Sequence, residues 1–381
     1  MSPLTLQSIS VHNFKSLLDF RLDFAKFTCL VGLNGSGKST VLQCLDFLAQ
    51  QLRGDLQGWL TQRQWQASDL SSKLTAKQNI SFTVILQTQT GEQVQWSGEF
   101  NRQPKQLRCT TEWILWQQAT LLKVEKGQYT LGKEWEYIPF EYQGSILSQL
   151  KTSQLHDSLI EFKSFFTQLK TLEVLDPAIL RQKTKASSQA ESQQQGLELG
   201  GKYLASRWAE FTEHQQQAIV DRLKQAYPQL KAVEVTKSKS GWCQLSISEK
   251  FSPQSLKTEA RHIADGVLRL IALFTQLHQS QSLLLLDEVE NGINLELIEL
   301  LMDSLVEAPS QVLVTTHNPV VLNYLKDEVA IEGMVYLYKR SDGATQAIRF
   351  FDIPSMRKKL TVMGPGEAYE DTRLTQLQGE I

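Results

Sequence analysis

Hydrophobic and polar residues alternate along much of the first 145 residues, and this alternation predicts short antiparallel strands. Five segments show it clearly: residues 4–11, 18–24, 79–87, 93–101 and 106–115. Polar turns separate them, and residues 125–128 (Glu-Lys-Gly-Gln) form a further hairpin-type turn. The first third of the chain is therefore expected to contain an antiparallel β subdomain.

The apolar spacing becomes helical after residue 145. Apolar residues from Leu155 to Leu169 recur at helical intervals, which predicts an amphipathic helix over about residues 146–173. Two further helices and a hairpin turn follow, at residues 202–211, 213–226 and 239–241. This middle part is expected to form an inserted, mainly helical lobe.

Buried-type strands alternate with helices in the last third of the chain. Strands are expected at residues 283–286, 311–315, 334–339 and 346–350, and helices over 266–279, over 295–305 and from about 319. Strands without polar positions that alternate with helices are typical of a parallel sheet in an α/β protein.

A glycine-rich stretch links the apolar segment 27–31 to a helical pattern that begins at Thr40. Residues 32–39 read Gly-Leu-Asn-Gly-Ser-Gly-Lys-Ser, which is a complete GxxxxGK[ST] phosphate loop. We expect Lys38 to reach the β- and γ-phosphates of a nucleoside triphosphate and Ser39 to coordinate Mg²⁺. The expected nucleotide contacts are Asn34, Gly35, Ser36, Gly37, Lys38, Ser39 and Thr40. The alternative is a glycine-rich turn without a ligand.

Two acidic residues and a histidine follow the later apolar strands. Asp287 and Glu288 come directly after Leu283–Leu286, and His317 follows the strand at 311–315. In a P-loop fold this edge lies beside the phosphate loop, so Asp287 is expected to hold Mg²⁺ and Glu288 to polarise the attacking water. His317 is expected to sense the γ-phosphate. The alternatives are a solvated turn after the strand and a histidine that only makes structural hydrogen bonds.

The composition argues against several classes of protein. The 381 residues carry a net charge of −2, so the whole molecule has no field that attracts polyanions. The four cysteines, at positions 29, 44, 109 and 243, have no paired spacing, which argues against a zinc site or a disulfide framework. No run approaches the roughly 20 apolar residues of a membrane span, and no signal-peptide pattern is present. A cytoplasmic protein without a membrane partner is expected.

The order of phosphate loop, long insertion, Asp-Glu strand and histidine resembles the ABC-type ATPases of the SMC, RecF and OLD group. Residues 11–17 (Val-His-Asn-Phe-Lys-Ser-Leu) look like the N-terminal stretch of RecF- and OLD-like ATPases. Residues 288–292 (Glu-Val-Glu-Asn-Gly) are similar to their DEPENG segment, and residues 263–269 look like their signature. The resemblance implies three further sets of site residues: Lys15 at the nucleotide, Asp265 and Gly266 in the signature, and Gln143 as a Q-loop ligand of Mg²⁺.

The resemblance also implies the architecture. The expected fold is an α/β P-loop NTPase of ABC-ATPase type with an antiparallel β subdomain and an inserted mainly helical lobe. Residues 1–145 would form the N-terminal part of the ATPase lobe, 146–258 the inserted lobe and 259–381 the C-terminal part. Two copies would enclose ATP between them, as a homodimer or a higher oligomer.

An ATPase of this kind usually controls another activity. The stretch after His317 is too short for the TOPRIM nuclease domain of OLD proteins, so the effector, for instance a nuclease, is expected on a separate polypeptide. Stand-alone ATPases of this type resemble components of anti-phage defence systems, and a role in DNA metabolism is the neighbouring possibility. The basic segment 349–360 could contact DNA phosphates or form a solvated helix face.

The sequence departs from the family signature at two positions, so alternative functions stay open. Ala264 stands where the signature usually has serine, and Val267 where it has threonine. A missing charge-assisted hydrogen bond to the γ-phosphate costs about 1.5–3 kcal/mol, so a weaker or slower ATP-bound dimer is expected. A non-hydrolysing ATP-dependent scaffold is one alternative. A transport-type nucleotide-binding subunit is another, and the Asn13-Phe14-Lys15 opening argues against it.

Overall fold

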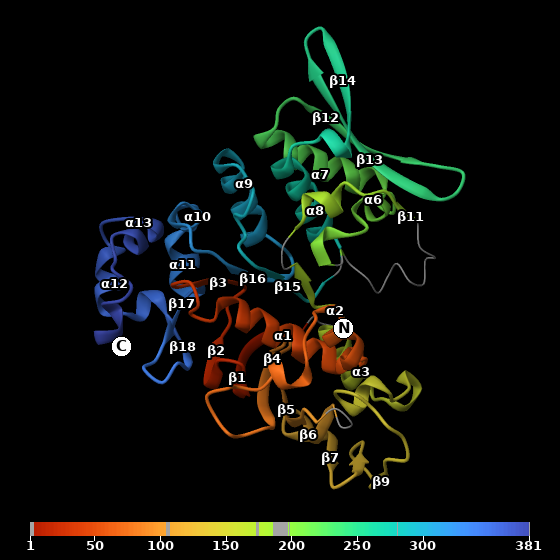
Figure 1. Cartoon of the computed structure of the whole chain (residues 1–381), viewed down its shortest axis with the longest axis vertical. Coiled ribbons are helices and arrows are strands. Elements are labelled where there is room, and N and C mark those ends of the chain that lie inside the picture. The colour runs from red at the N-terminus through yellow and green to blue at the C-terminus, as the bar shows by residue number, and fades with distance from the viewer. Residues whose placement is uncertain are drawn as a thin grey trace. The chain divides into compact units, whose positions relative to one another are not determined.

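The antiparallel strands expected from the alternating segments are present in the computed structural model (Figure 1), which describes residues 4–103, 107–172, 175–185, 197, 199–279 and 281–380. They form an eight-stranded sheet in the order β2-β1-β4-β5-β6-β7-β8-β9. Their bounds are β1 Thr5–Phe14, β2 Leu17–Asp23, β4 Ile80–Gln87, β5 Gln93–Asn101, β6 Arg108–Trp116, β7 Ala119–Glu125, β8 Gln128–Thr130 and β9 Glu136–Tyr137. The predicted β subdomain is confirmed.

One face of this sheet is covered by helices α1 (Lys38–Arg53) and α3 (Asp157–Thr167). Aromatic rings make the contact: Phe47 of α1 packs edge-on against Phe100 of β5, with ring centroids 5.0 Å apart. Trp96 of β5 packs against Phe166 of α3 at 5.0 Å. The alternation of each strand is thus explained by one buried and one open face.

The chain forms two compact units. The first unit comprises Met1–Leu169, Glu328–Val362 and Asp371–Ile381, and the second comprises Lys170–Asp327 and Met363–Glu370. The three-part division at residues 145 and 258 stays a sequence prediction.

A second set of strands in the first unit leads to the phosphate loop. Strand β3 (Phe27–Val31), fully buried, runs parallel to β17 (Met334–Lys339), and β17 pairs in antiparallel fashion with β18 (Thr345–Arg349). The chain passes from β3 through residues 32–37 into α1. The loop therefore joins the end of a central strand to the beginning of a helix.

The second unit contains a parallel set of strands. Strand β15 (Leu283–Leu286) lies between β10 (Lys170–Leu172) and β16 (Gln311–Thr315), and both pairings are parallel. Its main helices are α8 (Asp265–Leu277) and α9 (Leu295–Val306). Because β15 and β16 are buried at every position, their apolar sequences predicted them correctly.

A smaller antiparallel sheet also belongs to the second unit. Strand β13 (Trp242–Phe251) pairs with β11 (Thr184–Lys185), β12 (Leu230–Lys237) and β14 (Gln254–Glu259). Helices α6 (Leu204–Trp208) and α7 (Glu213–Ala226) lie between β11 and β12 in the chain. The remaining helices of the described chain are α2 Leu56–Gln62, α4 Pro177–Leu180, α10 Pro319–Asn323, α11 Asp327–Gly333, α12 Pro354–Lys359 and α13 Pro365–Glu370.

The long helix predicted over residues 146–173 is wrong. The structure has short 3-10 turns at Ile146–Ser148 and Thr152–Gln154, and then α3 over Asp157–Thr167. His156 caps α3, since its Nδ1 accepts a hydrogen bond from the Ser158 N–H at 3.2 Å. Residues 170–172 form β10 because pairing with β15 outweighs their helical spacing. Among the described residues, no helix has the length and apolarity needed to cross a membrane.

Candidate functional site

The phosphate loop has a backbone that only glycine adopts easily. Gly32, Gly35 and Gly37 have φ angles of 147°, 79° and 112°. A Cβ atom on Gly32 would lie 2.4 Å from the Leu337 carbonyl oxygen, and one on Gly37 would lie 2.5 Å from Thr345 Oγ1. These contacts explain the glycines at the first and last of these positions.

The expected nucleotide contacts of this loop come together at the N-terminus of α1. Lys38 Nζ donates hydrogen bonds to the carbonyl oxygens of Gly32 at 2.8 Å and Leu33 at 3.2 Å, so the ammonium group lies within the loop. Asn34, Gly35 and Ser39 are exposed. A lysine ammonium and the N–H groups at the start of a 16-residue helix form a favourable environment for an anion.

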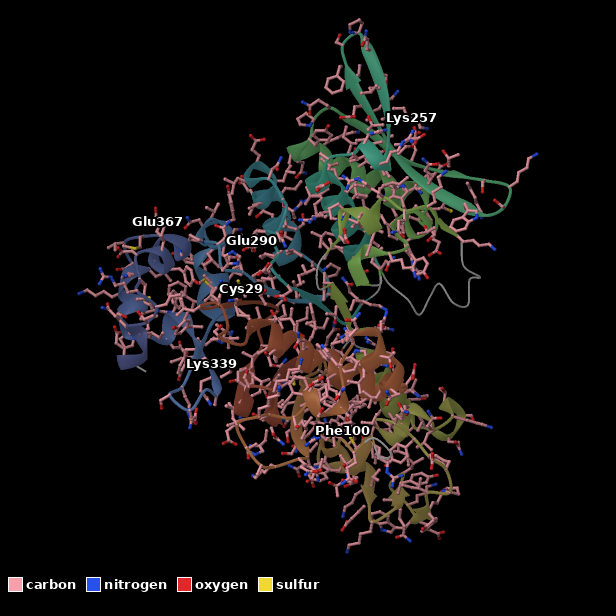
Figure 2. All side chains as sticks on the ribbon, viewed as in Figure 1. Cys29, Phe100, Lys257, Glu290, Lys339 and Glu367 are labelled. Atoms are coloured by element: carbon pink, nitrogen blue, oxygen red, sulfur yellow. The ribbon has the colours of Figure 1, made fainter. Side chains whose placement is uncertain are left out.

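Thr345, which begins β18, contacts this loop and was not predicted from the sequence. Its Oγ1 donates to the Ser36 carbonyl oxygen at 2.9 Å, and it lies near Ser16 Oγ at 2.8 Å and Lys339 Nζ at 2.9 Å. Figure 2 marks Lys339 at the end of β17. No local pattern around residue 345 indicates this contact, because its partner is 309 positions away.

The N-terminal segment at residues 13–17 forms a tight turn between β1 and β2. Asn13 has φ 69°, and its side chain is held by the Lys77 and Asn79 carbonyls and by the Ser72 N–H. Lys15 Nζ donates to Gln43 Oε1 of α1 at 2.8 Å and lies 3.4 Å from the centre of the Trp65 ring. The role of Lys15 as a nucleotide contact stays a prediction.

Gln143 lies in a loop that packs on α1. Its Oε1 accepts a hydrogen bond from the Gln57 N–H at 2.9 Å, in the first turn of α2. The next residue, Gly144, has φ 72°, and a Cβ there would be 2.4 Å from the Gln51 carbonyl oxygen. The structure thus gives Gln143 a partner within the first unit, and its role as a metal ligand stays a prediction.

In the second unit, Asp287 and Glu288 follow β15 as the sequence indicated. Thr315 Oγ1, at the end of the neighbouring strand β16, donates to Asp287 Oδ1 at 2.5 Å and accepts from the Glu288 N–H at 2.8 Å. Glu288 has φ 46° and is exposed. Thr315 therefore fixes both acidic residues, and sequence reasoning missed it because the threonine follows Asp287 by 28 positions.

His317 lies two residues beyond Thr315 and contacts Glu290. The His317 N–H donates to Glu290 Oε1 at 3.3 Å, and His317 Nδ1 lies 3.5 Å from the same oxygen. The His317 side chain is 53% exposed, whereas that of Glu290 is 9% exposed. Glu290 thus positions the loop that presents His317, and after Thr345 and Thr315 it is a third residue that was not predicted.

The signature segment forms the beginning of α8. Ala264 is the N-cap residue, and α8 starts at Asp265. Arg181 forms an ion pair with the Asp265 carboxylate and donates to the Ile263 carbonyl oxygen at 2.9 Å. Gly266 is buried, and a Cβ there would lie 3.4 Å from the Gly292 carbonyl oxygen. The predicted signature and the DEPENG-like segment are therefore in contact within the second unit.

Two of the basic side chains in segment 349–360 have partners in the first unit. Arg349 donates to the Asp23 carbonyl oxygen at 2.9 Å, and Lys359 pairs with Asp371 at 3.1 Å. Arg357 and Lys358 are exposed. This favours a structural role for the ends of the segment.

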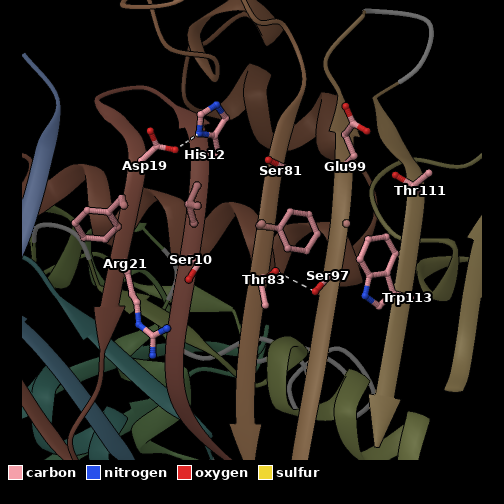
Figure 3. A pocket seen from close by; sticks show the side chains of 14 residues that line it. Ser10, His12, Asp19, Arg21, Ser81, Thr83, Ser97, Glu99, Thr111 and Trp113 are labelled. Carbon is pink, nitrogen blue, oxygen red and sulfur yellow. Dashed lines mark hydrogen bonds and ion pairs between the residues drawn. The ribbon is translucent and has the colours of Figure 1, made fainter. Parts of the chain in front are cut away.

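A pocket of about 480 Å³ lies on the open face of the eight-stranded sheet (Figure 3). Its floor is formed by small side chains such as Ser10, Thr83 and Ser97, and Trp113 lies at one side. None of the predicted site residues lines it. The phosphate loop and the Asp287–Glu288 turn, and not this pocket, remain the candidate functional site.

Comparison with known proteins gives a family. A model described as "AAA domain, putative AbiEii toxin, Type IV TA system" matches residues 27–107 and 159–323, which is more than half of the chain. The chain belongs to this family. The matched parts contain the phosphate loop, Asp287, Glu288 and His317. No curated protein matches the chain.

Solved structures of SMC heads are similar to this AAA-family chain. An SMC head bound to the C-winged helix domain of ScpA has a TM-score of 0.58 at 13% identity, covering 90% of this chain and 97% of that chain. An SMC head with an extended coiled coil, bound to the C-terminal domain of ScpA derived from Pyrococcus furiosus, has a TM-score of 0.55 at 12% identity, covering 94% and 100%. These likenesses confirm the α/β fold of the P-loop ATPase type.

Proposed function

We propose that this AAA-family protein binds ATP with Mg²⁺, hydrolyses the ATP, and assembles as a pair of copies that controls a separate effector. The proposal rests on two sets of predicted site residues, one in each unit. One unit presents a glycine-rich loop with Lys38 at a helix start. The other presents Asp287 and Glu288 at the end of a buried parallel strand, held by Thr315. An ATPase of this class requires both.

The roles follow from the chemistry of the groups. Lys38 and the N–H groups of the loop would bind the phosphates. The Ser39 hydroxyl and the Asp287 carboxylate are hard oxygen donors, which fit Mg²⁺, and Gln143 is a third oxygen donor in the prediction. Bound Mg²⁺ would neutralise phosphate charge. Glu288, exposed on its turn, would act as general base, and His317 would sense the γ-phosphate.

Several facts support a pair of copies and a separate partner. The signature segment 264–266 lies at the start of a 13-residue helix, where N–H groups can bind a phosphate presented by a second copy. The solved SMC heads that share the fold are bound to domains of ScpA. The family description names a putative toxin of a Type IV TA system. These support an effector, for instance a nuclease, in anti-phage defence or DNA metabolism.

ATP turnover by the wild type and by Glu288→Gln tests hydrolysis directly. The wild type should release phosphate in a Mg²⁺-dependent reaction, and Glu288→Gln should lose at least about a hundredfold in kcat. Glu299→Gln is the matched control, because Glu299 is an exposed glutamate of α9 in the same unit. Equal turnover by wild type and Glu288→Gln would contradict the proposal.

A non-hydrolysing, ATP-dependent scaffold is the second candidate, and Ala264 favours it. Alanine at the N-cap of α8 supplies no hydroxyl to a phosphate. Mass measurement with and without ATP, and with and without DNA, separates the outcomes. ATP-dependent dimers without turnover would favour the scaffold, whereas a monomer under all conditions would contradict both candidates.

A further inference from the structure

We propose that Thr345 is a positioning residue that sets the conformation of the phosphate loop and thereby its affinity for ATP. The inference rests on the proposed function, and it assigns a role to the β17–β18 hairpin. Thr345 is fully buried at the beginning of β18. Its backbone is also fixed, because the Thr345 N–H donates to the Ser16 carbonyl oxygen at 2.9 Å.

The direction of each hydrogen bond at the Thr345 hydroxyl follows from the chemistry of its partners. The Ser36 carbonyl oxygen can only accept, so the single hydroxyl proton goes to it, at 2.9 Å. The Lys339 ammonium can only donate, at 2.9 Å. Ser16 Oγ, at 2.8 Å, must then donate as well. One proton and two lone pairs are therefore all used, and the hydroxyl has one defined orientation.

Steric fit adds to this arrangement. Gly37 has φ 112° and ends the loop at the N-cap of α1. A Cβ on Gly37 would lie 2.5 Å from Thr345 Oγ1 and 2.9 Å from Thr345 Cγ2. The Thr345 side chain thus occupies the space that the glycine leaves open. It contacts two successive residues of the loop, Ser36 by a hydrogen bond and Gly37 by packing.

Ser36 has few other polar contacts that could replace this one. Its N–H donates to the Leu33 carbonyl oxygen at 3.1 Å, within the loop itself. Its Oγ has no hydrogen-bond partner among the described residues. Without the Thr345 hydroxyl, the Ser36 carbonyl would lose its donor from outside the loop. The loop would then sample more conformations, and ordering it would reduce the affinity for ATP.

The test compares Thr345→Val, Thr345→Ser and Thr130→Val in the full-length chain. Valine keeps the shape and removes the hydroxyl, whereas serine keeps the hydroxyl. Thr130 of β8 is the matched control, because it is a buried threonine of the same unit that donates to a backbone carbonyl, that of Lys133, at 3.0 Å. The readouts are the Kd for Mg·ATP by calorimetry, the steady-state KM and kcat, and the melting temperature.

Thr345→Val should weaken ATP binding about tenfold and raise KM by the same factor, with kcat at saturating ATP near that of the wild type. Thr345→Ser should restore affinity to within about twofold, and Thr130→Val should leave it unchanged. Ser16→Ala, which keeps the bond to Ser36, gives a milder variant if the valine variant does not fold, with an expected loss of about threefold.

Three results would count against the inference, and they are distinguishable. Equal affinities of wild type and Thr345→Val would overturn it alone and leave the proposed function intact. A wild-type chain that binds no ATP would overturn the proposed function and this inference with it. A fall in affinity in Thr130→Val as large as that in Thr345→Val would also count against it, because the effect would then be a general loss of stability.

Discussion

Thr315 Oγ1 donates a hydrogen bond to Asp287 Oδ1 at 2.5 Å, and so links the ends of two neighbouring parallel strands. The same oxygen accepts the Glu288 N–H at 2.8 Å, which holds Glu288 in a left-handed conformation with φ 46°. A non-glycine residue in this region costs free energy and persists only when its surroundings fix it. One hydroxyl thus sets the positions of both acidic residues of the candidate site.

Removing that hydroxyl should reduce turnover more than nucleotide binding. Thr315→Val should lower kcat about tenfold, because a hydrogen bond to a charged group is lost and the turn at Glu288 is released. The affinity for ATP, which we expect to depend on the phosphate loop, should change by less than about twofold. Steady-state kinetics with calorimetry measure both quantities.

Thr275→Val is the control for this experiment. Thr275 of α8 is fully buried, and its hydroxyl donates to the Ile271 carbonyl oxygen at 2.6 Å, so the same chemical change is made elsewhere in the second unit. Its kcat should stay near that of the wild type. Equal losses of kcat in the two variants would contradict a specific role for Thr315.

Local patterns predicted the elements of the candidate site but not the contacts that fix them. The glycines of residues 32–37 and the four leucines of β15 are dictated by backbone conformation and burial, and both are visible in the sequence. Thr315 and Thr345 act through partners that the tertiary structure brings to them, 28 and 309 positions away. A single threonine has no periodicity, and so these two residues could not be found from the sequence.

The same reason explains the error at residues 146–173. The apolar spacing there is helical, but the free energy of pairing β10 with β15 decides the conformation of residues 170–172. The boundaries of α7 at Glu213–Ala226 were predicted correctly, because Thr212 forms a capping box with Gln215 and a proline follows at position 228.

Serine at position 264 should stabilise the protein. Ala264 is the N-cap of α8, and its φ and ψ of −58° and 140° suit a capping serine. Ala264→Ser should add about 1 kcal/mol to the free energy of unfolding, measured by urea titration. It should also strengthen ATP-dependent dimerisation. Thr212→Ala, which removes the existing cap of α7, should lose a similar amount, and a destabilised Ala264→Ser would contradict the assignment.

We expect Arg181 to affect ATP-dependent dimerisation but not the affinity of one copy for ATP. Its ion pair with Asp265 and its hydrogen bond to the Ile263 carbonyl fix the signature turn. Arg181→Ala should weaken ATP-dependent dimerisation about fivefold, since the pair is half-exposed and screened, with the monomer's affinity for ATP unchanged. Mass photometry over a concentration series measures the dimer.

The matched control for Arg181 is Arg222→Ala. Arg222 of α7 is similarly half-buried in the second unit and pairs with Glu307 at 2.9 Å and with Ser304 Oγ at 3.1 Å. The Arg222→Ala variant should dimerise as the wild type does. If Arg222→Ala weakened the dimer as much as Arg181→Ala, the effect would be a general loss of stability.

Glu112 should make stability depend on pH. Burial raises the pKa of its carboxyl from 4.5 to about 7, against the opposing effect of hydrogen bonds from Ser145, Trp96 and Ile146. Between these values the folded state keeps a proton that the unfolded state releases, so the free energy of unfolding falls as pH rises. The total change is on the order of 3 kcal/mol.

Glu112→Gln isolates this contribution, because glutamine does not titrate. The difference in the free energy of unfolding, variant minus wild type, should therefore increase from pH 5 to pH 8. Urea unfolding at several pH values measures this difference. Parallel pH profiles for the two proteins would show that Glu112 does not titrate in this range.

A structure of Glu288→Gln solved with Mg·ATP would test the account most directly. The expected result is a single triphosphate that contacts Lys38 Nζ at its β- and γ-phosphates, with its Mg²⁺ held by Ser39 and Asp287 and with the side chain at position 288 facing the γ-phosphate. A triphosphate bound at the loop with position 288 in an unrelated pocket would contradict the account.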